Sequence, residues 1–284
     1  MEWTDPIPTE QRPEPRPSLR RGRRRRERRR RRPPPIPREA VPSFFTLGNL
    51  LSGFFSIVQA SQGNLEFAAW LIVFAGFFDL LDGMMARLAR ADSSFGVELD
   101  SLCDIVSFGV APSFLLYQFG LKEFPFGAFL AALPAITGAV RLARFNSIQS
   151  ATKTDYFVGL PIPAMAGTIV AFILTFQDDT WFAGLDHGRL SILIPLTILL
   201  AGLMVSPIRF VAPPQPTRRS LRKHPWRFVA FALGLLLVLF LQEVGLLISA
   251  VVYLFLGVGG AILWAVRVVS GKERDAGSDI ALDD

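Results

Sequence analysis

The chain has 284 residues, of which 51% are hydrophobic and 19% charged, and its formal net charge is +6. A soluble globular domain carries about a quarter charged residues, so this composition argues against a soluble protein. The lone cysteine, Cys103, excludes an intrachain disulfide, and two histidines, His187 and His224, argue against a histidine-rich metal site. Any metal ion would therefore be held by oxygen ligands, which favours Mg²⁺, Mn²⁺ or Ca²⁺.

The first 40 residues form a basic, proline-rich segment. Residues 20–32 read RRGRRRRERRRRR, with prolines on both sides. Such a segment repels itself and buries no apolar surface, which predicts a disordered cytoplasmic tail over 1–40. An arginine run also fits nucleic acid. Because this run leads directly into apolar segments, we expect anionic membrane lipids as its partner and no nucleic acid.

Eight apolar segments follow the tail. All are about 17–25 residues long, which is the length of a transmembrane helix. The sequence therefore predicts an all-α integral membrane protein with about eight transmembrane helices. The segments lie near 44–60, 65–87, 98–119, 124–145, 159–176, 190–208, 226–243 and 246–266.

The positive charges alternate between the connections. If the N-terminus is inside, the only positively charged residues in the outside connections are Lys122 and Arg189. All other connections are rich in positive charge, and cytoplasmic loops carry such an excess. This pattern predicts a multi-pass protein, in the cell membrane, with both termini in the cytoplasm. The positively charged residues of the inside connections and of the C-terminal tail are Arg87, Arg90, Arg141, Arg144, Lys153, Arg209, Arg218, Arg219, Arg222, Lys223, Arg227, Arg267, Lys272 and Arg274.

A basic segment, PPQPTRRSLRKHPWR, separates six apolar segments from the last two. Six helices can form a functional core to which the last pair is an addition. The predicted regions are a disordered tail at 1–40, a six-helix membrane domain at 41–212, a basic cytoplasmic linker at 213–227, a helix pair at 228–268 and a cytoplasmic tail at 269–284.

Residues 79–104, DLLDGMMARLARADSSFGVELDSLCD, contain two pairs of aspartates. Asp79 and Asp82 are three residues apart, and Asp100 and Asp104 are four apart, so each pair shares one helical face. A short polar turn between the pairs predicts two antiparallel neighbouring helices. All four carboxylates are then expected to converge at the cytoplasmic membrane surface.

Four neighbouring carboxylates need compensating positive charge. Arg87 supplies one charge, whereas two divalent cations would supply four, and carboxylate oxygens suit hard cations. Two such ions support phosphoryl transfer by stabilising the attacking and leaving oxygens. The small residues Gly83, Ala86 and Gly96 allow a phosphate-bearing ligand to approach the backbone. Tight helix packing is an equally good reading of Gly83.

The motif resembles the signature of the CDP-alcohol phosphatidyltransferases, D-x2-D-G-x2-A-R-x8-G-x3-D-x3-D, at every defined position. Further segments resemble the membrane-embedded phosphatidylserine synthases of that family: TLGNLLSG (46–53), SFGVAPS (107–113), RLARFN (141–146) and YFVGLPIPAMA (156–166). The resemblance implies a six-helix catalytic core. It also implies a reaction in which a CDP-linked lipid gives its phosphatidyl group to an alcohol and CMP leaves.

The resemblance also implies roles for individual residues. Two divalent cations, Mg²⁺ or Mn²⁺, would be held by Asp79, Asp82, Asp100 and Asp104, and Asp104 would be the general base. The CDP nucleotide would be bound by Thr46, Asn49, Asp82, Gly83, Ala86, Arg87 and Gly96.

Three polar residues after the motif are candidates for binding the substrate phosphate or the acceptor: Arg141, Arg144 and Asn146. Arginine binds phosphate in a bidentate fork, although arginines at this position also serve membrane topology. Cys103, at an undefined motif position, is interpreted as a packing residue. His187 and His224 are not expected to be catalytic.

The leading hypothesis is transfer from CDP-diacylglycerol to L-serine, giving phosphatidylserine and CMP. The nearest alternative is another acceptor, inositol phosphate or glycerol 3-phosphate, since phosphate-bearing acceptors need extra cationic groups. A cation transporter is a remote alternative, because intramembrane acids often mark ion paths. A lipid-binding scaffold is disfavoured because the motif is complete. Dimers are common in the resembled family, which leaves a homodimer open.

Overall fold

The computed structural model of the protein describes residues 40–89, 94–148, 156–182, 184–185, 187–211 and 225–269. Nearly all of these residues are helical, as the all-α prediction requires. The predicted tails at 1–40 and 269–284 and the linker at 213–227 lie outside the described residues, except at their edges.

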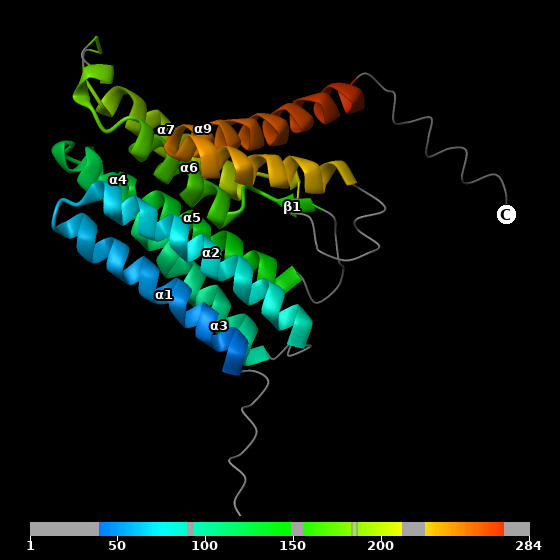
Figure 1. Ribbon diagram of the computed structural model, residues 1–284. Helices are drawn as coiled ribbons and strands as arrows, with labels where there is room; N and C mark the ends of the chain where they lie inside the picture. The colour runs from blue at the N-terminus through cyan, green and yellow to red at the C-terminus, as the bar shows by residue number, and fades with distance from the viewer. Residues whose placement is uncertain are drawn as a thin grey trace, which may run out of the picture. The chain divides into compact units, whose positions relative to one another are not determined.

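The first half of the described chain is a series of long helices. They are α1 Ala40–Ser61, α2 Leu65–Ala89, α3 Ser94–Asp104, the π-helix η1 Ile105–Val110, α4 Ala111–Phe119, the 3-10 turn η2 Leu121–Glu123 and α5 Gly127–Ile148. Gly63, at φ 86°, makes the turn between α1 and α2 in a conformation that favours glycine. The two helices then pack antiparallel along their length (Figure 1), and Ser56 Oγ donates to the Ala68 carbonyl at 2.8 Å.

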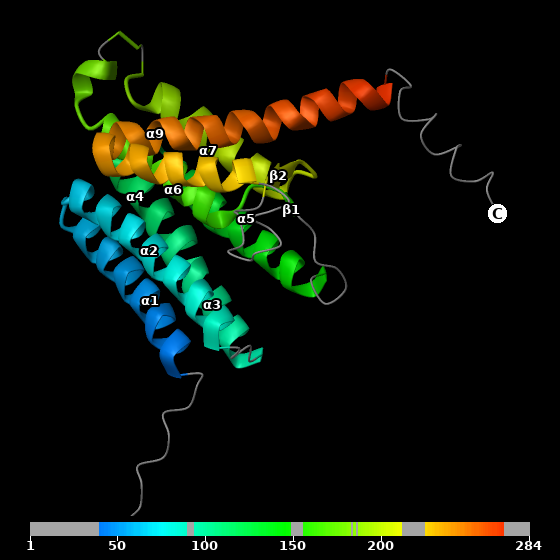
Figure 2. The same cartoon turned by 45° about the vertical axis from the view of Figure 1, so that its right-hand side comes forward.

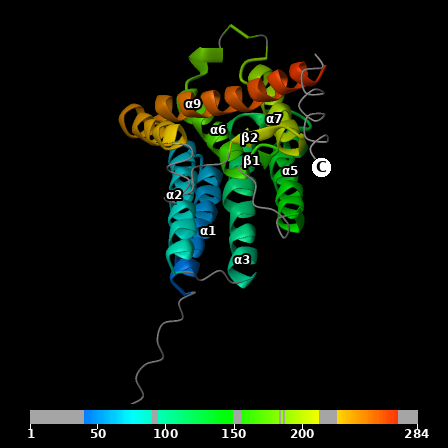
Figure 3. The same ribbon diagram turned by 90° about the vertical axis from the view of Figure 1, so that its right-hand side faces the viewer.

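Helices α3, η1 and α4 follow each other without a break and form one rod from Ser94 to Phe119. The rod contacts α1, α2 and α5. Figure 3 shows the axes of α1, α2, α3 and α5 lying nearly parallel to one another, whichever way the chain runs along each helix. The predicted segment at 98–119 therefore starts four residues too late, because polar residues at its beginning hide the first helical turn.

Helix α6, Ile162–Thr175, is the most enclosed element of the protein. Ten of its fourteen residues are buried, and α2, α4, η1 and α9 all contact it. An apolar helix that is buried on every side belongs to the interior. The 3-10 turn η3, Asp179–Phe182, and helix α7, Leu190–Val205, follow it.

Two short strands, absent from the all-α prediction, join the connections on either side of α6 and α7. Strand β1, Tyr156–Val158, pairs antiparallel with β2, Arg209–Val211, so that Phe157 faces Phe210. Gly159, at φ 78°, ends β1 just before α6.

The last described element, α9 Pro225–Val269, consists of two helices. Its helical geometry is broken at Gln242, where φ is 46° and ψ is −116°. The chain then doubles back (Figure 2): Gly245 packs on the backbone of Leu237, and Gly234 faces Ser249. The two halves match the predicted segments 226–243 and 246–266.

Five helical stretches in the described ranges have the length and hydropathy to cross a membrane: Phe44–Ser61, Leu65–Met85, Phe95–Phe119, Gly127–Asn146 and Pro225–Leu263. The last stretch contains both halves of α9. Helices α6 and α7, with 14 and 16 residues, are shorter than about 20 residues, the length that spans a bilayer. Each of the eight predicted apolar segments is helical, whereas eight separate membrane crossings stay a prediction.

Candidate active site

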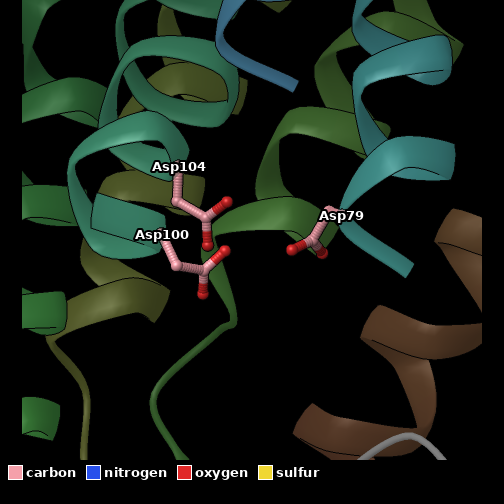
Figure 4. A group of neighbouring side chains, drawn as sticks. All are labelled: Asp79, Asp100 and Asp104. Carbon is pink, nitrogen blue, oxygen red and sulfur yellow. The ribbon is translucent and has the colours of Figure 1, made fainter. Parts of the chain in front are cut away.

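Three aspartates converge between α2 and α3. Asp79 on α2 and Asp100 and Asp104 on α3 each offer a carboxylate oxygen, and these oxygens lie within 4.8 Å of one another. Figure 4 shows Asp79 pointing across the gap toward the other two carboxylates. The spacing of four residues places Asp100 and Asp104 on one face of α3.

Asp82 lies one helical turn after Asp79 but is not a member of this group of three. Its side chain is 6% exposed, and its Oδ2 accepts a hydrogen bond from Thr46 Oγ1 of α1. It is nevertheless close enough to interact electrostatically with Asp79 and Asp100. The structure thus gathers three carboxylates at one point, and α1 holds the fourth beside them.

A second residue of α1, Asn49, contacts the aspartate group directly. Its side chain is fully buried, and Nδ2 donates to Asp104 Oδ1 at 3.1 Å. Within the described part of the chain, its Oδ1 has no hydrogen-bond partner. Thr46 and Asn49 are three residues apart on an apolar helix, and both belong to the segment TLGNLLSG, which the family resemblance had already pointed to.

The π-helix η1 begins immediately after Asp104. Ser107 in η1 donates to the Asn49 carbonyl at 2.9 Å, and its backbone lies against Gly53. A Cβ at Gly53 would stand 2.7 Å from Ser107 Cα, so only glycine fits this contact. Short π-helices often occur at functional sites. This one fixes Asp104 relative to α1, and the sequence alone did not predict it.

The other motif residues lie on the same two helices. Gly83 in α2 and Gly96 in α3 are half-buried. Ala86 and Arg87 belong to α2, but their side chains lie outside the described residues. Cys103 is buried at 1% exposure, consistent with a packing residue.

The three candidate acceptor residues occupy the end of α5 and differ in their surroundings. Arg141 is buried, with its guanidinium 5.8 Å from the Phe145 ring centre and 5.6 Å from that of Phe157. Arg144 is exposed. Asn146 Nδ2 donates to Ser101 Oγ on α3 at 2.9 Å. Since Ser101 adjoins Asp100, this bond ties the end of α5 to the aspartate helix.

The structure describes one of the two histidines. His187 is exposed in the connection between α6 and α7. His224 lies outside the described residues.

The donor set of the site fits hard divalent cations. The three converging groups are carboxylates, the ligands that Mg²⁺ and Mn²⁺ prefer. Asn49 adds a buried amide oxygen without a protein partner among the described residues. In the described ranges, Asp79, Asp100 and Asp104 form the only group of such side chains placed closely enough to hold a metal ion.

Known proteins share a large part of this sequence. The CDP-alcohol phosphatidyltransferase family model matches residues 39–205. A CDP-diacylglycerol–serine O-phosphatidyltransferase from Helicobacter pylori is 34% identical over 241 residues, which cover 84% of this chain and 98% of that protein. The Bacillus subtilis protein of the same name is 38% identical over 172 residues, which cover 60% of this chain and 89% of that protein. An archaetidylserine synthase from Methanothermobacter thermautotrophicus is 40% identical over 138 residues, which cover 48% of this chain and 58% of that protein.

The matched segment contains all four motif aspartates and every helix from α1 to α7. The chain belongs to the CDP-alcohol phosphatidyltransferase family.

Proposed function

We propose that the protein is a CDP-diacylglycerol–serine O-phosphatidyltransferase. It would transfer the phosphatidyl group of CDP-diacylglycerol to L-serine, giving phosphatidylserine and CMP. The observation that carries the proposal is the convergence of Asp79, Asp100 and Asp104 within the matched family segment. The names of the relatives from H. pylori and B. subtilis support serine as the acceptor.

The aspartates would hold the metal ions. Asp79, Asp100 and Asp104, with Asp82 beside them, would bind two divalent cations, Mg²⁺ or Mn²⁺. When bound, such ions stabilise the charge that develops on the transferred phosphate.

Asp104 would take the proton of the serine hydroxyl. Asn49 donates to its Oδ1 and so orients the carboxylate, which leaves Oδ2 to accept the proton. The serine oxygen would then form a bond to the phosphorus that carries diacylglycerol, while the bond from that phosphorus to CMP breaks. CMP leaves with the bonding electron pair.

The nucleotide would lie along the motif residues of α1, α2 and α3. Gly83, Ala86 and Gly96 would allow its phosphates to approach the backbone. Asp82, fixed by Thr46, would accept hydrogen bonds from the nucleotide, and Arg87 would neutralise its charge. Asn49 would line the same space.

Arg141 would bind the anionic group of the acceptor. Among the residues that the structure describes, no carboxylate pairs with its buried guanidinium, and its Nε–H has no hydrogen-bond partner. A buried charge requires a partner of opposite charge, and the serine carboxylate supplies one with bidentate geometry. Asn146 would orient the polar part of the acceptor from the same end of α5.

The site would face the cytoplasm, where soluble serine meets lipid headgroups. The excess of Lys and Arg in alternate connections supports this orientation and a location in the cell membrane. In this arrangement 41–212 is the catalytic domain and 228–268 is an added helix pair. The cytoplasmic side holds the basic tail at 1–40, the linker at 213–227 and the tail at 269–284.

A panel of acceptors tests the proposal. Purified protein with CDP-diacylglycerol is expected to release CMP when serine is added. A chelator should stop this CMP release, and added Mg²⁺ or Mn²⁺ should restore it. The measurement is CMP release with serine, glycerol 3-phosphate and inositol phosphate in turn. The buried guanidinium of Arg141 would also suit a phosphate, so CMP release with glycerol 3-phosphate and none with serine would contradict the proposal.

Arg141→Lys tests the acceptor role. The change keeps the charge but removes the planar fork, so the KM for serine should rise about tenfold, as expected for the loss of a charge-assisted hydrogen bond. The KM for CDP-diacylglycerol should stay unchanged. Arg144→Lys, at an exposed position of the same helix, tests the other candidate arginine in the same assay. An unchanged KM for serine in Arg141→Lys would assign acceptor binding to other residues.

A further inference from the structure

The second half of α9 is packed closely against strand β2. Tyr253 donates its hydroxyl to the Val211 carbonyl at 3.2 Å, and its ring stacks on Phe210 with centres 5.8 Å apart. Phe210 is fully buried. Its ring occupies the space beside Gly257, where an added Cβ would overlap it. Both Tyr253 and Gly257 therefore determine where β2 lies.

The position of strand β2 determines that of strand β1, because the two strands are paired. Phe157 of β1 is directly opposite Phe210 of β2, and Tyr156 is opposite Val211. Residues opposite each other in an antiparallel pair lie on the same face and contact each other. The Arg209 guanidinium also stands 4.7 Å above the Tyr156 ring and links the two strands a second time.

Strand β1 in turn supplies one side of the surroundings of Arg141. The Phe157 ring lies 5.6 Å from the guanidinium and 5.7 Å from the Phe145 ring, which it meets edge to face. Tyr253 itself is near enough to interact electrostatically with Arg141. The position of this buried cation thus depends on residues of α9 that are more than 100 positions later in the chain.

We infer that the C-terminal helix pair is a positioning element for the acceptor site. Through β2 and β1, Tyr253 and Gly257 hold the Arg141 guanidinium where it meets the anionic group of the acceptor. This inference rests on the proposed function and gives the helix pair a role that the aspartate motif does not require. The match to the H. pylori relative spans 241 residues, more than the family segment 39–205 contains, so it includes residues outside that segment.

Two substitutions in α9 test the inference through the separate KM values of the two substrates. Gly257→Val, which displaces Phe210, should raise the KM for serine about tenfold, and Tyr253→Phe, which removes one hydrogen bond, about threefold. The KM for CDP-diacylglycerol should stay unchanged in both. Gly260→Val is the control, since no atom lies within 4 Å of a Cβ added there.

A chemical readout separates this inference from the proposed function. Phenylglyoxal modifies accessible arginines, and mass spectrometry of the peptides gives the rate at Arg141. We expect faster modification of Arg141 in Gly257→Val and Tyr253→Phe than in the wild type and Gly260→Val. If the wild type releases no CMP with serine, the proposed function fails, and a faster modification rate still supports the positioning of Arg141.

Two results would overturn the inference. One is an unchanged modification rate and an unchanged KM for serine in both α9 variants, while the wild type is active with serine. The other is a fall in kcat with every acceptor and no change in either KM, which indicates a general loss of structure. Tyr253→Phe, which keeps the stacked ring, decides the question if Gly257→Val does not fold.

Discussion

Asp104→Asn is expected to lower the turnover of the enzyme by about a thousandfold, within the range of about 10²–10⁴ that a general base contributes. The substitution preserves the size of the side chain and an oxygen that can accept from Asn49 Nδ2. The protein should therefore keep its folded structure and lose the group that takes the proton. The measurement is CMP release with serine at saturating Mg²⁺.

The metal concentration distinguishes the two roles of Asp104. If Asp104 only held a metal ion, a high Mg²⁺ concentration would restore turnover in Asp104→Asn. If Asp104 is the base, the turnover of Asp104→Asn should stay about a thousandfold lower at every metal concentration. Glu98→Gln is the matched control, because Glu98 is an exposed acid on the same helix, α3. Recovery at high Mg²⁺ would remove Asp104 from the base role and keep it as a ligand.

Gly53→Ala is expected to destabilise the protein by about 1–3 kcal/mol, the usual cost of extra atoms in a packed interior. The added Cβ would lie 2.7 Å from Ser107 Cα, so α1 and η1 must move apart. Because Asp104 directly precedes η1 and contacts Asn49 of α1, turnover should fall as well. Thermal unfolding in detergent and CMP release measure the two effects.

Two further variants sharpen the Gly53 prediction. Gly202→Ala in α7 is the control, since an added Cβ there meets no atom within 4 Å. Ser107→Gly combined with Gly53→Ala should give little recovery, because the backbone Cα of residue 107 remains in the way. Full stability and turnover in Gly53→Ala alone would show that α1 and η1 are not held this closely.

The sequence predicted what depends on local spacing. Apolar runs located the helices, and the spacing of four between Asp100 and Asp104 placed both carboxylates on one face of α3. The gap between the apolar segments 44–60 and 65–87 likewise located the connection between α1 and α2.

The contacts that complete the site join residues far apart in the chain, and local spacing carries no signal for them. Asn49 meets Asp104 across 55 residues, and Thr46 meets Asp82 across 36. Asp82, which accepts the latter bond, stands beside the group of three aspartates and is not one of its members. Strands β1 and β2 have three residues each and lie in connections, so neither has an alternating pattern long enough to recognise.

The pairing of β1 with β2 has a consequence for the order in which the protein becomes functional during its synthesis. Asp104, the last of the aspartates proposed to hold the metal ions, comes early in the chain, so the aspartate group can assemble before most of the chain has been synthesised. Phe157 has no partner strand until Phe210 has been made, and β2 has no support until Tyr253 follows. If Arg141 binds the acceptor as proposed, a nascent chain that stops before Tyr253 would have the aspartate group without an ordered acceptor site, and the enzyme would become active only after its last helix has been made.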